Sequence, residues 1–351
     1  MNKIKIPVVG FNITNHCNLN CTGCYTLSNY ELKGHSLWHD HYQYYKEWAN
    51  KISIDKFELY GGEPLLNPTV IDWFIGLSEL WPDAKGNLTT NGYALNKKNK
   101  RLYDIFKNSN GKYHLEVSNH NNNTMDLIFK KIYDWIGVPA QVKPYPDNYS
   151  EIPNFNQNFI ISYEKVRGKD WPKISSFDEW NNLPDWIRKE CIEIHQISPS
   201  ILLNSSNGWK IVDENGVIII VRNSTQFENG ALIPEEDYSG FKFHKSDAKL
   251  AHDVCGNKTC IEFYDGKLHK CNTVGHFQEF QEQFNVDLDD DDTTILKEYK
   301  PATINMSTVE LNNWFENIDN PMPQCRFCPE IKKNILVQAT TKKIFFQRKI
   351  N

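Results

Sequence analysis

Residues 15–25 read Asn-His-Cys-Asn-Leu-Asn-Cys-Thr-Gly-Cys-Tyr and place Cys17, Cys21 and Cys24 in a C-x3-C-x2-C spacing. The stretch just before them, residues 5–11, is rich in β-branched and apolar residues and predicts a strand. An iron–sulfur cubane normally takes four cysteine ligands. Three thiolates with no fourth cysteine nearby leave one iron open for a substrate or cofactor. We therefore expect these thiols to hold a [4Fe–4S] cluster with an open iron.

A zinc site is the alternative interpretation of these thiols. Structural zinc normally takes four Cys or His ligands in finger-like spacing, and His16, directly beside Cys17, is badly placed to be the fourth. Disulfides are disfavoured because the chain has nine cysteines, an odd number, and they fall into groups. The isolated Cys191 lies in a stretch of helical character, residues 186–195, and is interpreted as a buried, inert thiol.

The composition is that of a soluble globular protein, with 40% hydrophobic and 24% charged residues over 351 positions. This length favours two domains, or one large domain with an appended module. The net charge of −5 predicts no general attraction to nucleic acid or to an anionic membrane. No stretch resembles a signal peptide or approaches the roughly 18 apolar residues of a membrane-spanning helix. We therefore expect a cytoplasmic protein.

Strands and helices are predicted to alternate through much of the chain. The predicted strands lie at residues 5–11, 56–60, 86–90, 113–118 and 140–142, and the predicted helices at residues 38–52, 70–81, 97–107 and 125–136. Strands that alternate with helices at this spacing indicate β/α units and a parallel sheet. The pattern is irregular at residues 144–201, and another short strand is expected at residues 217–221. Beyond about residue 235 His and Cys become dense, so we expect a domain boundary there.

Polar or glycine-rich motifs follow three of these strands. Gly61-Gly62-Glu63-Pro64 comes after the second strand, where two glycines allow a close approach of the backbone to a ligand and a carboxylate or carbonyl suits an ammonium group. A simple strand-to-helix turn is the alternative. Thr89-Thr90-Asn91-Gly92 ends the third strand, where Asn-Gly is also typical of an ordinary turn. Ser118 ends the fourth strand.

These motifs, in this order, resemble the radical S-adenosylmethionine (SAM) superfamily. Cys17, Cys21 and Cys24 resemble the ligands of its SAM-binding [4Fe–4S] cluster. Gly61-Gly62-Glu63-Pro64 resembles the motif that holds the methionine amino group of SAM.

Other residues that resemble the superfamily are expected to contact the rest of the SAM molecule. Thr90 and Asn91 match a strand end that lies beside the cofactor, and Ser118 matches a polar position that commonly meets the ribose or carboxylate. The residue before the third cysteine is usually bulky and packs near the adenine. Here it is Gly23, and we expect Tyr25 to take that role.

The resemblance implies an α/β fold: a partial (β/α)6 TIM-like barrel over residues 1–235 and a small C-terminal α+β cysteine-rich module over residues 236–351. It also implies a mechanism, in which a donor such as flavodoxin or ferredoxin reduces the cluster. SAM is then split into methionine and a 5′-deoxyadenosyl radical, which abstracts a hydrogen atom from the substrate. Arg222, after the strand at residues 217–221, is a candidate to contact the SAM carboxylate.

Five further thiols form a second set: Cys255, Cys260, Cys271, Cys325 and Cys328. The spacing C-x5-G-x4-C over residues 260–271 predicts two short strands joined by a hairpin turn at Asp265-Gly266. The set resembles the auxiliary-cluster region of the SPASM and twitch subfamilies. Five thiols suffice for one second [4Fe–4S] cluster with one to spare. The spacing leaves open which four are ligands, with Cys260 and Cys271 the strongest candidates, together with one or both of Cys325 and Cys328.

Structural zinc is the alternative for this second set. His252, His269 and His276 flank it. Hydrogen bonding of these histidines to the ligands of the site is an alternative, but we expect each of them at the surface. The acidic run at residues 287–292 is interpreted as a solvated loop.

Three functional hypotheses follow. The first is a radical SAM enzyme that oxidises or rearranges a small molecule, such as a sugar, nucleotide or amino-acid derivative. The second is a radical SAM maturase that modifies a peptide or protein. The third is a zinc-binding interaction protein without catalysis.

Overall fold

The computed structural model describes residues 3–30, 34–121, 124–138, 140–144, 208–224, 226–228, 230–236, 239–256, 261–331 and 334–336. The chain packs as two compact units, which are described separately. Unit 1 comprises Met1–Gly86 and Gln226–Asn351, and unit 2 comprises Asn87–Thr225. The predicted domain boundary near residue 235 stays a prediction. The predicted helix at residues 186–195, with Cys191, lies outside the described residues.

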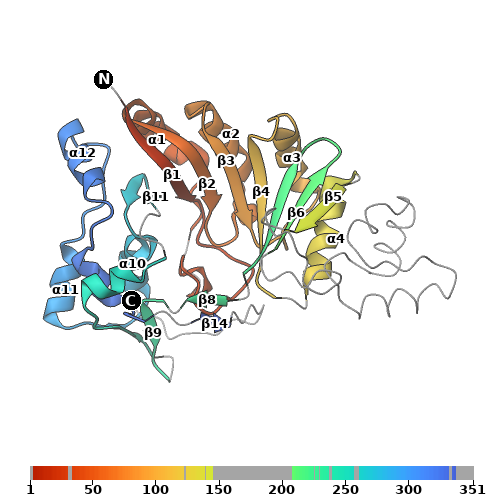
Figure 1. Ribbon diagram of the computed structural model, residues 1–351. Coiled ribbons are helices and arrows are strands. Elements are labelled where there is room, and N and C mark those ends of the chain that lie inside the picture. Colours follow the sequence, from red (N-terminus) through yellow and green to blue (C-terminus); the bar gives the residue numbers. More distant parts are fainter. Residues whose placement is uncertain are drawn as a thin grey trace. The chain divides into compact units, whose positions relative to one another are not determined.

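Unit 1 is built on a sheet that joins the beginning of the chain to its C-terminal part (Figure 1). Its strands are β1 (Ile4–Asn12), β2 (Ile52–Tyr60), β11 (Ile261–Tyr264) and β12 (Lys267–His269). β1 lies between β2 and β11 and is parallel to both, whereas β11 and β12 form an antiparallel hairpin. The hairpin turn predicted at Asp265-Gly266 is thereby confirmed. The connection from β1 to β2 includes helix α1 (Trp38–Lys51), and helix α2 (Val70–Leu80) follows β2.

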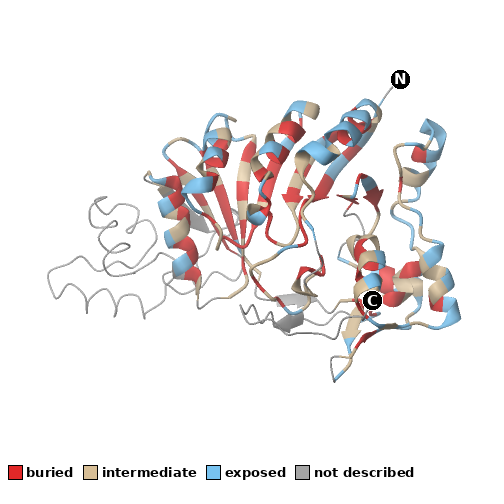
Figure 2. Ribbon diagram, turned by 180° about the vertical axis from the view of Figure 1, so that it is seen from behind, coloured by how far each residue is buried: buried red, intermediate tan, exposed pale blue. Residues whose placement is uncertain are grey.

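Aromatic packing holds α1 and α2 against this sheet. Phe11 of β1 is fully buried. Its ring centroid lies 5.4 Å from that of Tyr45 on α1, 6.4 Å from that of Trp73 on α2 and 5.0 Å from that of Phe263 on β11. Figure 2 shows buried residues concentrated in the strands and on one side of the helices. This one-sided burial is what the apolar pattern of residues 70–81 predicts.

The C-terminal part of unit 1 has a second apolar core. Its helices are α9 (Ala248–Asp253), α10 (Asn272–Gln283), α11 (Asp290–Lys297) and α12 (Thr308–Glu316), with short strands β8 (Gln226–Glu228), β9 (Leu232–Pro234), β10 (Phe241–Phe243), β13 (Val286–Asp287) and β14 (Asn334–Leu336). The core comprises Phe241, Phe243, Phe277, Phe280, Phe284, Phe327 and Ala231, and it also buries Leu27 from the N-terminal segment. We call this group the phenylalanine core.

The acidic run at residues 287–292 was predicted to be a solvated loop. Asp287 and Asp289 to Asp291 are exposed, as predicted, but the second half of the run is helical. Asp289 is the N-cap of α11 and accepts a hydrogen bond from the Asp292 backbone N–H at 2.8 Å. Asp290 to Asp292 form the first helical turn, where carboxylates are favoured by the partial positive charge of the helix N-terminus. Asp292 is only 1% exposed.

Unit 2 contains the remaining strands of the predicted β/α pattern. They are the end of β3 (Lys85–Thr90), β4 (Tyr113–Asn119), β5 (Ala140–Pro144), β6 (Gly208–Asp213) and β7 (Ile218–Asn223), with helices α3 (Lys100–Lys107) and α4 (Met125–Ile136). β4 and β7 pair in parallel, with Ser118 opposite Arg222. β6 is antiparallel to both β7 and β5.

The predicted α/β class is confirmed, because parallel pairs form the centre of the sheet in each unit. The described strands of each unit form an open sheet and not a closed barrel. Two features differ from a regular succession of β/α units: the antiparallel edge formed by β5 and β6, and β11, which pairs with β1. In the described part of the chain, no helix combines the length and the apolar character needed to cross a membrane.

Candidate functional site

The three N-terminal cysteines lie in the loop that follows β1. Burial raises the pKa of the Cys21 thiol, and the neighbouring thiols of Cys24 and Cys17 raise it further. The three sulfur atoms therefore share one region, and a thiolate at the buried Cys21 needs a cation to compensate its charge. Iron provides that compensation, since thiolates are the usual ligands of iron–sulfur clusters. The donor set of this loop fits such a cluster.

The sulfur atoms also receive local hydrogen bonds. The Leu19 backbone N–H donates to Cys17 Sγ at 3.4 Å, and the hydroxyl of Thr26 lies 3.3 Å from Cys24 Sγ. The His16 ring packs on the ring of His35, with centroids 4.4 Å apart. The expectation that His16 is badly placed to act as a fourth ligand stays a prediction.

The Gly61-Gly62 pair is bonded directly to the cysteine loop. The Gly62 N–H donates to the Thr14 carbonyl and the Glu63 N–H to the His16 carbonyl, both at 2.7 Å. A Cβ at Gly61 would lie 2.4 Å from the Thr14 carbonyl oxygen, and one at Gly62 would lie 2.3 Å from that of His16. The two glycines are therefore needed because the backbone of the cysteine loop lies so close to them. The sequence had predicted that a ligand, and not this backbone, approaches the glycines.

Glu63 is fully buried and caps the short 3-10 helix Pro64–Leu66. Its carboxylate accepts a hydrogen bond from the Leu65 backbone N–H at 3.0 Å. Residues 61–64 therefore form a turn, as one interpretation of the sequence predicted, at the same place where the other interpretation predicted a cofactor-binding motif. The contacts of residues 61–64 and of Tyr25 with SAM stay predictions.

In unit 2, Thr90 and Asn91 are buried at the end of β3. The Thr90 hydroxyl accepts a hydrogen bond from the Gly92 N–H, and the Asn91 side-chain oxygen accepts one from the Tyr93 N–H, both at 3.0 Å. These bonds form the predicted turn. A contact of these two side chains with SAM stays a prediction.

Ser118 is half-buried on β4, on the sheet face opposite the fully buried Val117. Arg222 lies opposite it on β7, and its guanidinium forms an ion pair with Glu116 at 2.6 Å. Sequence reasoning missed Asn87 on β3, which is 1% exposed and whose side-chain oxygen has no hydrogen-bond partner among the described residues. Buried amides rarely remain unsatisfied, so Asn87 is an additional candidate to contact a ligand.

Four cysteines of the second set line one small cavity: Cys255, Cys271, Cys325 and Cys328. Burial raises the pKa of the Cys271 thiol to about 12, and the thiols of Cys255 and Cys325 also raise it. The rest of the cavity wall is largely apolar and includes Phe243 and Phe277. Four converging thiols fit a second cluster. The fifth predicted ligand, Cys260, lies outside the described residues.

The three histidines that flank this set were expected at the surface, and this prediction was wrong. His252, His269 and His276 are 8%, 6% and 0% exposed. They lie on the short elements α9, β12 and α10, and His252 also lines the cavity of the second thiol set.

A buried polar network joins α10 to the end of β1. The Asn12 side-chain amide lies 2.8 Å from Nε2 of His276, which lies 3.2 Å from the carboxylate of Glu262. Nε2 of a neutral ring either accepts from Asn12 or donates to Glu262, so the two partners compete for one nitrogen. Nothing in the local sequence marks these residues as neighbours.

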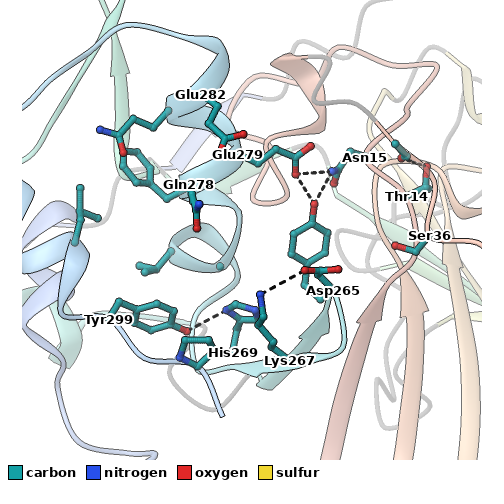
Figure 3. A pocket seen from close by; sticks show the side chains of 18 of the residues that line it. Thr14, Asn15, Ser36, Asp265, Lys267, His269, Gln278, Glu279, Glu282 and Tyr299 are labelled. Atoms are coloured by element: carbon teal, nitrogen blue, oxygen red, sulfur yellow. Dashed lines mark hydrogen bonds and ion pairs between the residues drawn. The ribbon is translucent and has the colours of Figure 1, made fainter. Parts of the chain in front are cut away.

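A second part of the network lines a cavity of about 860 Å³ in unit 1. The Asn15 amide donates to the Glu279 carboxylate at 3.2 Å and lies 3.0 Å from the hydroxyl of Tyr264, which also donates to Glu279. Figure 3 shows Glu279 and Glu282 of α10 on one side of the cavity, opposite Thr14 and Asn15. The cavity lies beyond the carboxyl ends of β1 and β11.

In the described part of the chain, no three or more His, Cys, Asp or Glu side chains are arranged to hold a single metal ion. Residues 11–136 match the model of the radical SAM superfamily. The chain carries a radical SAM domain. This domain begins on β1 and includes Cys17, Cys21, Cys24, the Gly61-Gly62-Glu63 motif and Ser118. Members of its superfamily bind a [4Fe–4S] cluster and SAM.

Curated relatives of the radical SAM domain carry the name GTP 3′,8-cyclase. The protein of Nautilia profundicola is 32% identical over 102 residues, which are 28% of this chain and 32% of that protein. The protein of Crocosphaera subtropica is 25% identical over 182 residues, which are 48% of this chain and 53% of that protein. The chain therefore matches about half the length of these relatives or less.

Two solved structures show a partial likeness. anSMEcpe with bound AdoMet is 18% identical, with 38% of this chain and 40% of that chain covered and a TM-score of 0.29. BtrN in complex with AdoMet and 2-DOIA is 21% identical, with 34% and 48% covered and a TM-score of 0.28. Scores this low do not establish a shared fold, so the family assignment rests on the sequence match.

Proposed function

We propose that this chain is a radical SAM enzyme that abstracts a hydrogen atom from a small-molecule substrate, in a net oxidation or rearrangement. The observation that carries the proposal is the loop of Cys17, Cys21 and Cys24, whose thiols are near enough to interact electrostatically and whose backbone is bonded to the Gly61-Gly62 motif. When bound and reduced, the [4Fe–4S] cluster and SAM supply a 5′-deoxyadenosyl radical.

The residues of the chain bind and orient the cofactor. Gly61, Gly62 and Glu63 hold the methionine amino group, and Pro64 fixes the turn behind them. The two hydrogen bonds from Gly62 and Glu63 to the cysteine loop fix the motif against the backbone just before Cys17. Such fixed positioning is what radical chemistry requires of the protein, since the cofactor carries the difficult step.

The remaining SAM contacts come from Tyr25 at the adenine and from Thr90, Asn91 and Ser118 at the ribose and carboxylate. Leu19 and Cys21 exclude water from part of the loop, because each is only 7% exposed. Partial burial of this kind limits quenching of a reactive radical by solvent-borne groups.

Two observations support a small molecule as the substrate. The curated relatives are named for a reaction of GTP, a nucleotide. The cavity of about 860 Å³ is within the usual size range of small-molecule sites and lies at the carboxyl ends of parallel strands, where barrel enzymes bind substrates. We infer a polar substrate of the sugar, nucleotide or amino-acid class.

We further propose that Cys255, Cys271, Cys325 and Cys328 surround a second [4Fe–4S] cluster, while Cys260, which lies outside the described residues, stays a predicted ligand. Their convergence on one mostly apolar cavity supports this ligand set. A cluster held there would supply an acceptor for one electron in a net oxidation. An external donor such as flavodoxin or ferredoxin would supply the electron to a cluster held by Cys17, Cys21 and Cys24.

The test is anaerobic reconstitution followed by metal counting and an assay of 5′-deoxyadenosine release. Two clusters predict about eight irons per chain, and Cys21→Ala or Cys271→Ser should each retain about four. Cys21→Ala should release no 5′-deoxyadenosine, while Cys191→Ala serves as the thiol control and should behave like the wild type. Zinc without iron at the N-terminal thiols, or SAM cleavage by Cys21→Ala, would refute the proposal.

Substrate class is tested by adding GTP, sugar nucleotides, amino acids or short peptides to the reduced enzyme. Stimulated release of 5′-deoxyadenosine by a small molecule is the expected result. Stimulation by peptides alone would identify a maturase.

A further inference from the structure

Helix α10 begins at a thiol of the second site. Cys271 is its N-cap residue, and the Cys271 carbonyl accepts the Gly275 N–H at 2.9 Å. The helix then runs for 12 residues away from that site, to Gln283. Its side chains reach the N-terminal cysteine loop on both sides of the three thiols.

Upstream of Cys17, the contacts are polar and buried. His276 lies 2.8 Å from the Asn12 amide, and Glu279 accepts from the Asn15 amide at 3.2 Å. His276 is fully buried, and Asn12 and Asn15 are 2% and 3% exposed. Figure 3 shows Glu279 of α10 directed toward Asn15 across the edge of the cavity.

Downstream of Cys24, the contacts are apolar. The Tyr30 ring packs edge-on against the Phe280 ring of α10, with centroids 5.3 Å apart. Leu27 is buried in the phenylalanine core that Phe277 and Phe280 help to form. Leu27 has φ +56°, a conformation that leucine rarely adopts. Tertiary packing must hold it there, and α10 supplies part of that packing.

We propose that α10 is the positioning element of the N-terminal cysteine loop, with His276 and Glu279 as its positioning residues. One short helix then joins the second thiol site, through Cys271, to the two ends of the loop that holds the first cluster. The orientation of the open iron toward SAM depends on this helix. The inference rests on the proposed function and adds a role for residues that touch neither cluster nor SAM.

The decisive comparison is Glu279→Ala against Glu282→Ala. Both change a glutamate of α10 that lines the same cavity, but only Glu279 is bonded to Asn15. In the reconstituted full chain we expect wild-type iron content for both variants. Glu279→Ala should raise the KM for SAM about tenfold and reduce the shift that SAM produces in the electron paramagnetic resonance spectrum of the reduced N-terminal cluster. Such a loss corresponds to one charge-assisted hydrogen bond.

A conservative variant and a double-mutant cycle separate positioning from folding. Glu279→Gln keeps an acceptor oxygen and should restore the SAM response to within about threefold of the wild type. Asn15→Ala should mimic Glu279→Ala, and the double variant should be no worse than either single one, because both remove the same bond. If Glu279→Ala loses iron or unfolds, Asn15→Ala and Glu279→Gln still report on the same bond.

Two outcomes overturn the inference while leaving the proposed function intact: a Glu279→Ala spectrum and KM equal to those of Glu282→Ala, or fully additive effects in the cycle. A wild-type cluster that does not respond to SAM refutes the proposed function itself. The two failures are therefore distinguishable.

Discussion

Replacing Gly62 with alanine tests the contact between the glycine motif and the cysteine loop. The added Cβ would lie 2.3 Å from the His16 carbonyl oxygen and 2.6 Å from its carbonyl carbon, both backbone atoms. Real Cβ atoms essentially never approach closer than 3.0 Å, so the loop backbone must retreat by roughly 0.7 Å. That movement pulls on the loop one residue before Cys17.

The magnitude follows from two effects. Overpacking of this kind costs about 1–3 kcal/mol. The movement also stretches the two 2.7 Å hydrogen bonds from Gly62 and Glu63 to the loop, each worth about 1 kcal/mol. We expect Gly62→Ala to lower the free energy of unfolding of the apoprotein by about 3 kcal/mol and to reduce iron retention at the first site.

The assay is chemical denaturation of the apoprotein, followed by iron counting and SAM binding after reconstitution. Gly230→Ala is the matched control, because a Cβ there meets nothing within 4 Å. It should change the free energy of unfolding by less than about 0.5 kcal/mol. If Gly62→Ala retained the stability, iron and SAM affinity of this control, the argument that the motif fits against the loop backbone would be refuted.

Three further predictions concern stability. The phenol of Tyr103 donates to the Asp213 carboxylate at 2.6 Å, and burial followed by this bond raises the pKa of Tyr103 to about 12. Because this value lies above the ordinary pKa of about 10, the contribution of the protonated Tyr103 to stability is complete below pH 10 and is lost as the pH rises to about 12. The free energy of unfolding of Tyr103→Phe should therefore depend less on pH in that window. Lys100→Met should lower the free energy of unfolding by about 1–3 kcal/mol, because Lys100 Nζ donates to two carbonyls at the end of α4, at 2.5 and 2.6 Å. The control is Lys98→Met, since Lys98 is exposed. Equal denaturation midpoints for the two variants would contradict the prediction. Ser307→Ala removes the capping box that Ser307 and Glu310 form at α12 and should destabilise this helix by about 1 kcal/mol. Amide hydrogen exchange in α12 should then be faster, and unchanged exchange would contradict the prediction.

Local patterns in the sequence predicted most elements of the fold. The apolar periodicity at residues 70–81 and 125–136 corresponds to α2 and α4, and Asp265-Gly266 forms the expected hairpin turn. These features depend on neighbours a few residues apart, so a short window contains the information. The cysteine spacing likewise predicted that three thiols share one loop, because their separation is too short for them to lie far apart.

The grouping of the cysteines and the alternation of strands and helices can thus be predicted from the sequence alone. The tertiary structure decided that β11 pairs with β1, that β5 and β6 form an antiparallel edge, and that His276 meets Asn12. It also decided that Gly61 and Gly62 lie against the backbone of the cysteine loop, and that the three histidines flanking the second cysteine set are buried. Each of these depends on residues tens to hundreds of positions apart, whose meeting is selected by the packing of the whole unit and leaves no signature in any local stretch.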